Sequence, residues 1–244
     1  MGRFFNREAA LVAFSLLVAG IAIGLVAGLR PWIVAAVSVG LVAVLHWPLT
    51  MAFQGWVLEF YVEHDLLERA LRLAIEIRDS SVLRRERQKA MIDVALVHIA
   101  RGDYENAIKN LRGVITTSER ATTKAVVQAS WGYSLCHLGR ELDQAEEMIQ
   151  AAMKSTPEEP LFIYFLGLLR FRQGRPAEAK ELIEKSLAEE PDFKLPYPGE
   201  RSFTMAQVLR ALGDEGAARA ELEKAKVASG RFGKMAAEEL AKVA

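Results

Sequence analysis

The chain has 244 residues, of which 51% are hydrophobic and 25% are charged, and 31 Lys and Arg residues balance 31 Asp and Glu residues. This composition excludes a disordered chain, and the single cysteine, Cys136, excludes a disulfide-stapled miniprotein. A net charge of zero argues against a general nucleic-acid-binding protein, which carries a basic excess. The charge is unevenly distributed, because residues 1–58 carry a net charge of +2 and the remaining residues −2.

Two long uncharged runs lie near the N-terminus, at residues 9–29 and 32–58. Each exceeds the roughly 20 residues that a helix needs to cross a bilayer. The sequence therefore predicts a short tail at 1–8 and a transmembrane helical hairpin at 9–52, with its second span at about 32–52. A cleaved signal peptide is the alternative, although its apolar core would be unusually long and no A-x-A cleavage site follows.

Basic residues flank both predicted spans on the same side of the membrane. Arg3 and Arg7 precede the first span and seven Lys and Arg residues occur at 69–89, whereas the turn of the hairpin carries only Arg30. By the positive-inside rule, the sequence predicts a multi-pass protein of the bacterial plasma (inner) membrane with both termini in the cytoplasm.

Small residues recur every four positions in the predicted spans. At this spacing they share one helix face, which lets another backbone approach closely. Two interpretations stay open: the small faces close the hairpin on itself, or one of them docks a membrane helix of a partner. The predicted positions for membrane helix packing are Gly20, Gly24, Gly28, Ala36 and Gly40.

The rest of the chain contains an internal repeat. A small residue followed four positions later by a bulky apolar one recurs at intervals of 37, 38, 34 and 39 residues. The leading residues of the copies are Ala107, Ala145, Ala179 and Ala218, and Ala70 leads a weaker copy that has Ala74 in place of the bulky residue.

A glycine stands five or six residues before each of the last four leading alanines. The apolar residues follow a helical period, and no long alternating run of β-branched residues indicates a sheet. Each copy therefore predicts a helix, a tight turn and a second helix. The turn glycines are Gly102, Gly139, Gly174 and Gly213.

This pattern resembles the tetratricopeptide repeat (TPR) family, whose 34-residue motif reads W-x2-L-G-x2-Y…A-x3-F…P. The copy nearest to the motif contains Leu166-Gly167 and Ala179-x3-Ile183, and another contains Trp131-Gly132. Two other copies lack the Leu-Gly pair.

The predicted fold class is all-α: a transmembrane hairpin followed by a TPR-type helix-turn-helix solenoid. About five repeats occupy 53–230, the first of them degenerate, and a C-terminal capping helix occupies 231–244. The capping helix is expected because the terminal repeat of a solenoid exposes an apolar face.

No motif for catalysis, nucleotide binding or metal binding occurs in the sequence. The sequence therefore predicts a protein that is not an enzyme and that binds no cofactor and no metal. Cys136 and His137 are adjacent, but adjacent side chains on a helix point about 100° apart, so a packing thiol is favoured over a catalytic pair.

The resemblance implies that partners bind the concave surface, which is lined by the first helix of each repeat. Most of the side chains at these positions are apolar or aromatic, which favours an amphipathic helix or a hydrophobic segment as the bound element. The implied groove residues are Ile92, Leu96, Tyr133, Leu161, Tyr164, Leu168, Phe171, Phe203, Gln207 and Arg210.

The sequence thus predicts a membrane-anchored scaffold that recruits or assembles partner proteins at the cytoplasmic face of the membrane. Its expected partners are proteins and the lipid bilayer, and nucleic acid is not among them. The alternative is an accessory or assembly subunit of an integral membrane complex, such as a transporter, a translocon or a respiratory complex.

Overall fold

The computed structural model describes residues 53–115, 120–157, 159–189, 199–228 and 230–242. The chain divides into two compact units, residues 1–59 and 60–244. In the first unit the described residues, 53–59, are helical. The predicted tail at 1–8, the predicted hairpin at 9–52 and its packing residues Gly20, Gly24, Gly28, Ala36 and Gly40 lie outside the described residues.

The predicted localisation is corrected by the helices that the structure describes. The longest of them, α4 (Arg84–Arg101) and α6 (Ala121–Leu138), have 18 residues each and carry polar side chains along their length. Throughout the described ranges, no helix combines the length and the apolar character that a membrane crossing requires. The prediction of a multi-pass plasma membrane protein with cytoplasmic termini is therefore wrong on this evidence.

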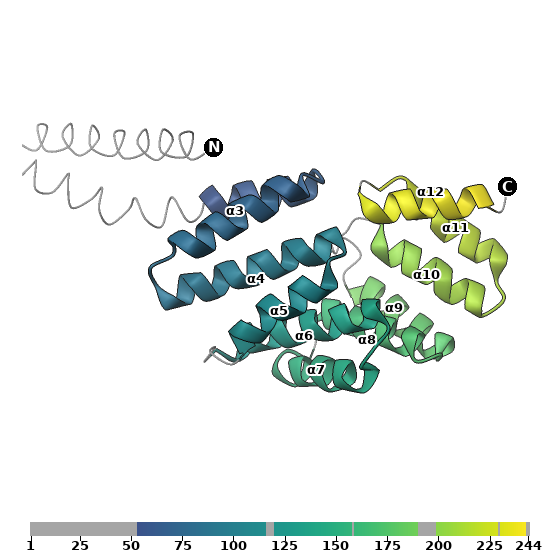
Figure 1. The fold of residues 1–244 in the computed structure, drawn as a ribbon. Coiled ribbons are helices and arrows are strands. Elements are labelled where there is room, and N and C mark those ends of the chain that lie inside the picture. The colour runs from purple at the N-terminus through teal and green to yellow at the C-terminus, as the bar shows by residue number, and fades with distance from the viewer. Residues whose placement is uncertain (1–52, 116–119, 158, 190–198, 229, 243–244) are drawn as a thin grey trace, which may run out of the picture. The chain divides into compact units, whose positions relative to one another are not determined.

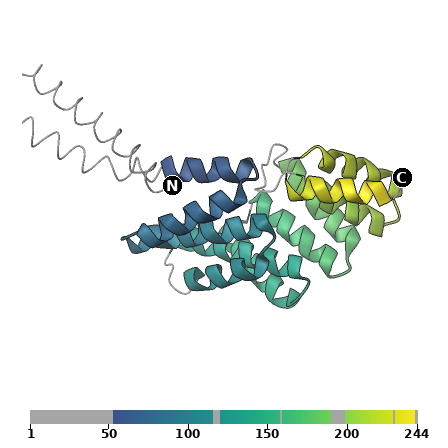
Figure 2. The same cartoon turned by 45° about the horizontal axis from the view of Figure 1, so that its top comes forward.

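The second unit is built of helices that pair in succession (Figures 1 and 2). Helix α3 is followed by the pairs α4–α5, α6–α7, α8–α9 and α10–α11, and α12 packs along the last pair. The bounds of the helices besides α4 and α6 are α3 Leu67–Ser80, α5 Tyr104–Ile115, α7 Leu142–Ser155, α8 Pro160–Arg172, α9 Pro176–Glu189, α10 Glu200–Ala211, α11 Glu215–Lys226 and α12 Arg231–Lys242.

The predicted turn glycines lie between the two helices of each pair. Gly102 ends α4 with a φ of 78°, a left-handed conformation that glycine adopts without strain. Its amide donates to the Ile99 carbonyl at 2.8 Å, and the next amide, of Asp103, donates to the His98 carbonyl at 2.8 Å. These bonds close the end of the helix, so the turns at Gly102, Gly139, Gly174 and Gly213 are confirmed in the structure.

The repeated small residues lie where the two helices of a pair cross. A Cβ atom on Gly132 of α6 would lie 2.8 Å from the carbonyl oxygen of Ala145 on α7, and Gly167 of α8 meets α9 in the same way. Close approach of the two backbones therefore requires the small residues. The leading alanines are all fully buried: Ala70, Ala107, Ala145, Ala179 and Ala218.

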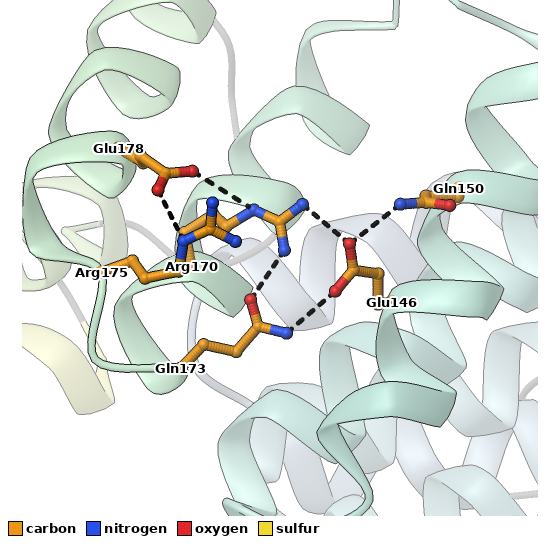
Figure 3. A network of polar contacts seen from close by, with 6 residues as sticks. All are labelled: Glu146, Gln150, Arg170, Gln173, Arg175 and Glu178. Atoms are coloured by element: carbon orange, nitrogen blue, oxygen red, sulfur yellow. Dashed lines mark hydrogen bonds and ion pairs between the residues drawn. The ribbon is translucent and has the colours of Figure 1, made fainter.

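A network of polar contacts links the pairs α6–α7 and α8–α9 (Figure 3). Glu146 of α7 accepts hydrogen bonds from Arg170 at 2.8 Å and from Gln173 at 2.9 Å, both at the C-terminal end of α8. Arg170 also lies 3.8 Å from a carboxylate oxygen of Glu178 on α9. The hydrogen bonds from Arg170 and Gln173 lower the pKa of Glu146 from 4.5 to about 2.

We expect the substitution Arg170→Gln to lower the free energy of unfolding by about 1 kcal/mol at pH 7, since a charge-assisted bond to a partly exposed carboxylate is lost. The pKa of Glu146 is depressed in the folded state, so its contribution is present above pH 4.5 and is lost as the pH falls toward 2. Urea unfolding between pH 3 and 7 should show wild type and variant converging at the acid end. Arg219→Gln, at an exposed guanidinium of α11, is the control. A difference in the free energy of unfolding between wild type and Arg170→Gln that stays constant from pH 3 to 7 would contradict this account.

Candidate functional site

The predicted groove residues lie on the helices that the resemblance implies, but many of them are buried. Tyr133 of α6, Tyr164 and Leu168 of α8, and Phe203 of α10 expose 3% of their surface or less and share one hydrophobic core. The structure thus brings these four side chains together in the interior of the second unit.

The other predicted groove residues are partly exposed. Ile92, Leu96, Leu161 and Phe171 are partly buried and pack against the same core. Gln207 is also of intermediate exposure. These side chains are the part of the predicted groove that solvent reaches, and their role in binding a partner stays a prediction.

The last predicted groove residue, Arg210, is engaged by the C-terminal helix. Its guanidinium donates to the carboxylate of Glu239 on α12 and lies 3.4 Å from Glu215 on α11. The hydrogen bond from Arg210 to Glu239 raises the pKa of Arg210. Helix α12 therefore contacts the predicted groove at this residue.

A buried carboxyl group lies in the interior of the second unit. Glu200, the first residue of α10, is fully buried, and its Oε1 accepts a 2.6 Å hydrogen bond from the Tyr133 hydroxyl. The Nε2 of His137 lies 3.0 Å from the same oxygen. Tyr133 and His137 are one turn apart on α6, so they present one polar face to Glu200.

Two further residues complete this group. The ring of Tyr104, at the start of α5, stacks on His137 with 4.6 Å between ring centroids and 7° between planes. Arg231, at the start of α12, donates a hydrogen bond to the Tyr104 hydroxyl. We call Tyr104, Tyr133, His137, Glu200 and Arg231 the Glu200 cluster.

The Glu200 cluster is enclosed by apolar side chains, and burial sets the protonation of its members. Burial raises the pKa of Tyr104 to about 12 and lowers the pKa of His137, because both groups are shielded from water. Nearby, the Tyr164 hydroxyl lies 3.0 Å from Thr204 Oγ1 of α10, and burial and the charge of Glu200 raise the pKa of Tyr164. These groups are arranged to join helices and are shielded from any substrate in solution.

The neighbouring thiol is equally shielded. Cys136 is buried, and burial raises the pKa of its thiol to about 12, so the reactive thiolate is disfavoured at neutral pH. This placement agrees with the predicted packing thiol.

The amino-acid sequence carries only a partial signal for the Glu200 cluster. Tyr133 is predicted to line the concave surface. His137 follows four positions later and so lies on the same helix face, and this spacing indicates that the two side chains could bind one group together. Glu200 carries no comparable signal, because it is 67 residues from Tyr133 and follows a connection between repeats.

Comparisons with known proteins agree with this fold. No protein-family model matches the chain. The chain is similar to the TPR repeat-containing protein PA4667 of Pseudomonas aeruginosa, with 30% identity over 95 residues that cover 39% of this chain and 16% of that protein. The chain thus spans about a sixth of the length of this curated relative.

Two solved structures are similar to the chain at low sequence identity. TTC0263, a thermophilic TPR protein of Thermus thermophilus, is 17% identical, with a TM-score of 0.53 over 71% of this chain and 90% of that one. MamA (41-end) from Desulfovibrio magneticus RS-1 is 15% identical, with a TM-score of 0.45 over 72% of this chain and 92% of that one. The likeness to TTC0263 confirms the predicted all-α solenoid, and we conclude that the described part of the chain has a TPR-like fold.

Proposed function

We propose that this protein is a non-enzymatic scaffold that binds and brings together other proteins. The binding surface would be the inner, concave face of its TPR-like solenoid, which the first helix of each pair lines. The observation that carries the proposal is that the first helices α4 and α8 carry partly exposed apolar side chains that pack against the core. Ile92 and Leu96 of α4 and Leu161 and Phe171 of α8 form this exposed part. The partner would be an amphipathic helix or a hydrophobic segment, because a few apolar anchors suffice to hold such an element.

The burial of the reactive groups supports a role without catalysis. The Cys136 thiol has a raised pKa and a buried position, and His137 and Glu200 are enclosed with 9% and 0% of their side chains exposed. A catalytic group must come within hydrogen-bond reach of its substrate. The non-enzymatic assignment is therefore the one that these side chains favour.

Site-specific photo-crosslinking in intact cells tests the proposal. A photoreactive amino acid is placed at Ile92 or at Gln207, both partly exposed on first helices. Matched controls are Glu147 of α7 and Lys185 of α9, which are exposed on second helices. We expect discrete protein adducts from Ile92 and Gln207 at several times the yield from the controls. Equal adduct patterns at all four positions would contradict a partner site on the inner face.

A further inference from the structure

The short loop that joins α3 to α4 presents two large apolar side chains to solvent (Figure 1). Val82 exposes 81% of its surface, and the next residue, Leu83, exposes 57%. A single apolar side chain on a protein surface needs no explanation, whereas adjacent ones can form the apolar part of a contact surface. The loop therefore offers an apolar anchor point to a partner.

Hydrogen bonds hold this loop in one conformation. Ser81 is buried, and its hydroxyl donates to the Ile77 carbonyl of α3 at 2.6 Å. The guanidinium of Arg87, in the first turn of α4, donates to the Ser81 carbonyl at 3.0 Å. These bonds tie the loop to both helices. Val82 and Leu83 are thus displayed by an ordered backbone, which lowers the entropy cost of binding to them.

Positive charge surrounds the two apolar side chains. Residues 78–89 contain five basic and two acidic residues, a net charge of +3, although residues 59–244 as a whole carry a net charge of −2. Arg85 and Lys89 of α4 are exposed and four positions apart, so their side chains lie on the same side of the helix. We call this surface the α3–α4 corner; it consists of Val82, Leu83, Arg85, Arg87 and Lys89.

The charge of the α3–α4 corner favours ionised carboxylates in its vicinity. A hydrogen bond from Arg78 lowers the pKa of Asp79, and the charge of Arg87 lowers it further. Burial raises the pKa of Asp93 to about 6, and the charge of Lys89 opposes that shift. A carboxylate that approaches the corner from solvent is attracted in the same way.

The side chains of the α3–α4 corner suit a protein segment better than a lipid surface. Residues 78–89 contain no aromatic residue, whereas segments that lie in a membrane interface use Trp or Phe as anchors. Arginine guanidinium groups, such as that of Arg85, bind a carboxylate through two parallel hydrogen bonds. Clusters of arginine are a recurring means of recognising acidic peptide motifs.

We propose that the α3–α4 corner binds an acidic segment of a partner protein. An apolar residue of that segment packs against Val82 and Leu83, and its carboxylates pair with Arg85 and Lys89. The inference goes beyond the proposed function, because it assigns a second binding surface, formed by a loop and the first turns of α4.

The test measures binding of a fluorescein-labelled hexapeptide, EELEEL, to the full chain by fluorescence anisotropy at about 50 mM salt. We expect wild type to bind EELEEL at least tenfold more tightly than the uncharged peptide QQLQQL. The variant Arg85→Glu/Lys89→Glu should bind EELEEL at least tenfold more weakly than wild type. The matched control is Lys109→Glu/Arg219→Glu, at exposed positions of α5 and α11. It changes the net charge equally and should alter binding less than twofold.

The apolar part of the proposal has its own variant. Val82→Ser/Leu83→Ser keeps every charge and should weaken binding of EELEEL at least threefold, because the leucines of the peptide lose their contact. Unchanged binding in this variant would overturn the apolar contact. If Arg85→Glu/Lys89→Glu does not fold, as judged by circular dichroism, the neutral variant Arg85→Gln/Lys89→Gln is scored by the same criteria.

Two other outcomes would overturn the binding of an acidic protein segment. Equal loss of binding in both charge-reversed variants would show that the net charge of the protein governs binding, and not the α3–α4 corner. Cosedimentation with vesicles of phosphatidylserine and phosphatidylcholine is measured in parallel. If Arg85→Glu/Lys89→Glu abolishes vesicle binding while wild type does not bind EELEEL, the corner is a lipid-binding surface instead.

Discussion

The substitution Asp93→Asn is expected to raise the free energy of unfolding by roughly 2–3 kcal/mol at pH 7. Burial on α4 raises the pKa of Asp93 from 3.8 to about 6, and the positive charge of Lys89 offsets only part of this shift. At pH 7 the folded protein therefore holds a poorly solvated carboxylate, which costs about 1.4 kcal/mol for each unit by which its pKa is raised. Asn has the same shape and no charge, so the variant avoids that cost.

The difference in stability between Asp93→Asn and wild type should depend on pH. The pKa of Asp93 is higher in the folded state than in the unfolded state, so the folded state binds more protons between pH 4 and 6. Stability contributed by this group falls as the pH rises through that window and stays low above it. Urea unfolding at pH 4, 5, 6 and 7 should therefore show the variant and wild type diverging toward neutral pH. Glu147→Gln, at an exposed carboxylate of α7, is the control. A variant that is no more stable than wild type at pH 7 would refute the prediction.

The substitution Gly132→Ala is expected to lower the free energy of unfolding by roughly 1–3 kcal/mol. The added Cβ atom would lie 2.7 Å from Cγ1 of Ile149 and 2.8 Å from the carbonyl oxygen of Ala145, so α6 and α7 must move apart. The gain in helix propensity, about 1 kcal/mol, opposes this loss only in part. Thermal unfolding followed by circular dichroism measures the net effect.

Gly216 supplies the matched control for this substitution. It lies in α11, and the nearest atom to an added Cβ is Oδ1 of Asp214, at 3.8 Å. Gly216→Ala should therefore raise the melting temperature slightly while Gly132→Ala lowers it. A melting temperature that moves in the same direction in both variants would show that the crossing of α6 and α7 does not require glycine.

The fold was predictable from sequence wherever the signal is local. Leading alanines such as Ala145 and Ala179 and turn glycines such as Gly102 reflect helix crossings and helix ends, which depend on residues a few positions apart. The first helices of the pairs were placed correctly for the same reason. Every repeat needs a small residue at its helix crossing and a glycine at its turn. These residues therefore recur along the sequence, and the repeat can be recognised from them.

The candidate site was predictable only in part. Tyr133 and Tyr164 lie on first helices, as predicted, but both are buried, and the hydrogen bond from Tyr133 to Glu200, two pairs along the chain, leaves no periodic trace in the sequence. Glu200 would ordinarily be read as a solvated first-turn residue that favours the helix dipole. Its burial depends on Tyr133 and His137, which only the folded chain brings near.

The contact between Tyr104 and Arg231 joins residues that are 127 positions apart. During synthesis Tyr104 is therefore made well before its partner Arg231. Domains begin to fold from the N-terminal side during synthesis, at about 5–20 residues per second. The early repeats can pair their helices as they emerge, but the hydrogen bonds from Tyr133 to Glu200 and from Arg231 to Tyr104 form only after residues 200 and 231 have been made. For several seconds the nascent chain therefore lacks the long-range hydrogen bonds that join Tyr104 and Tyr133 to the C-terminal helices.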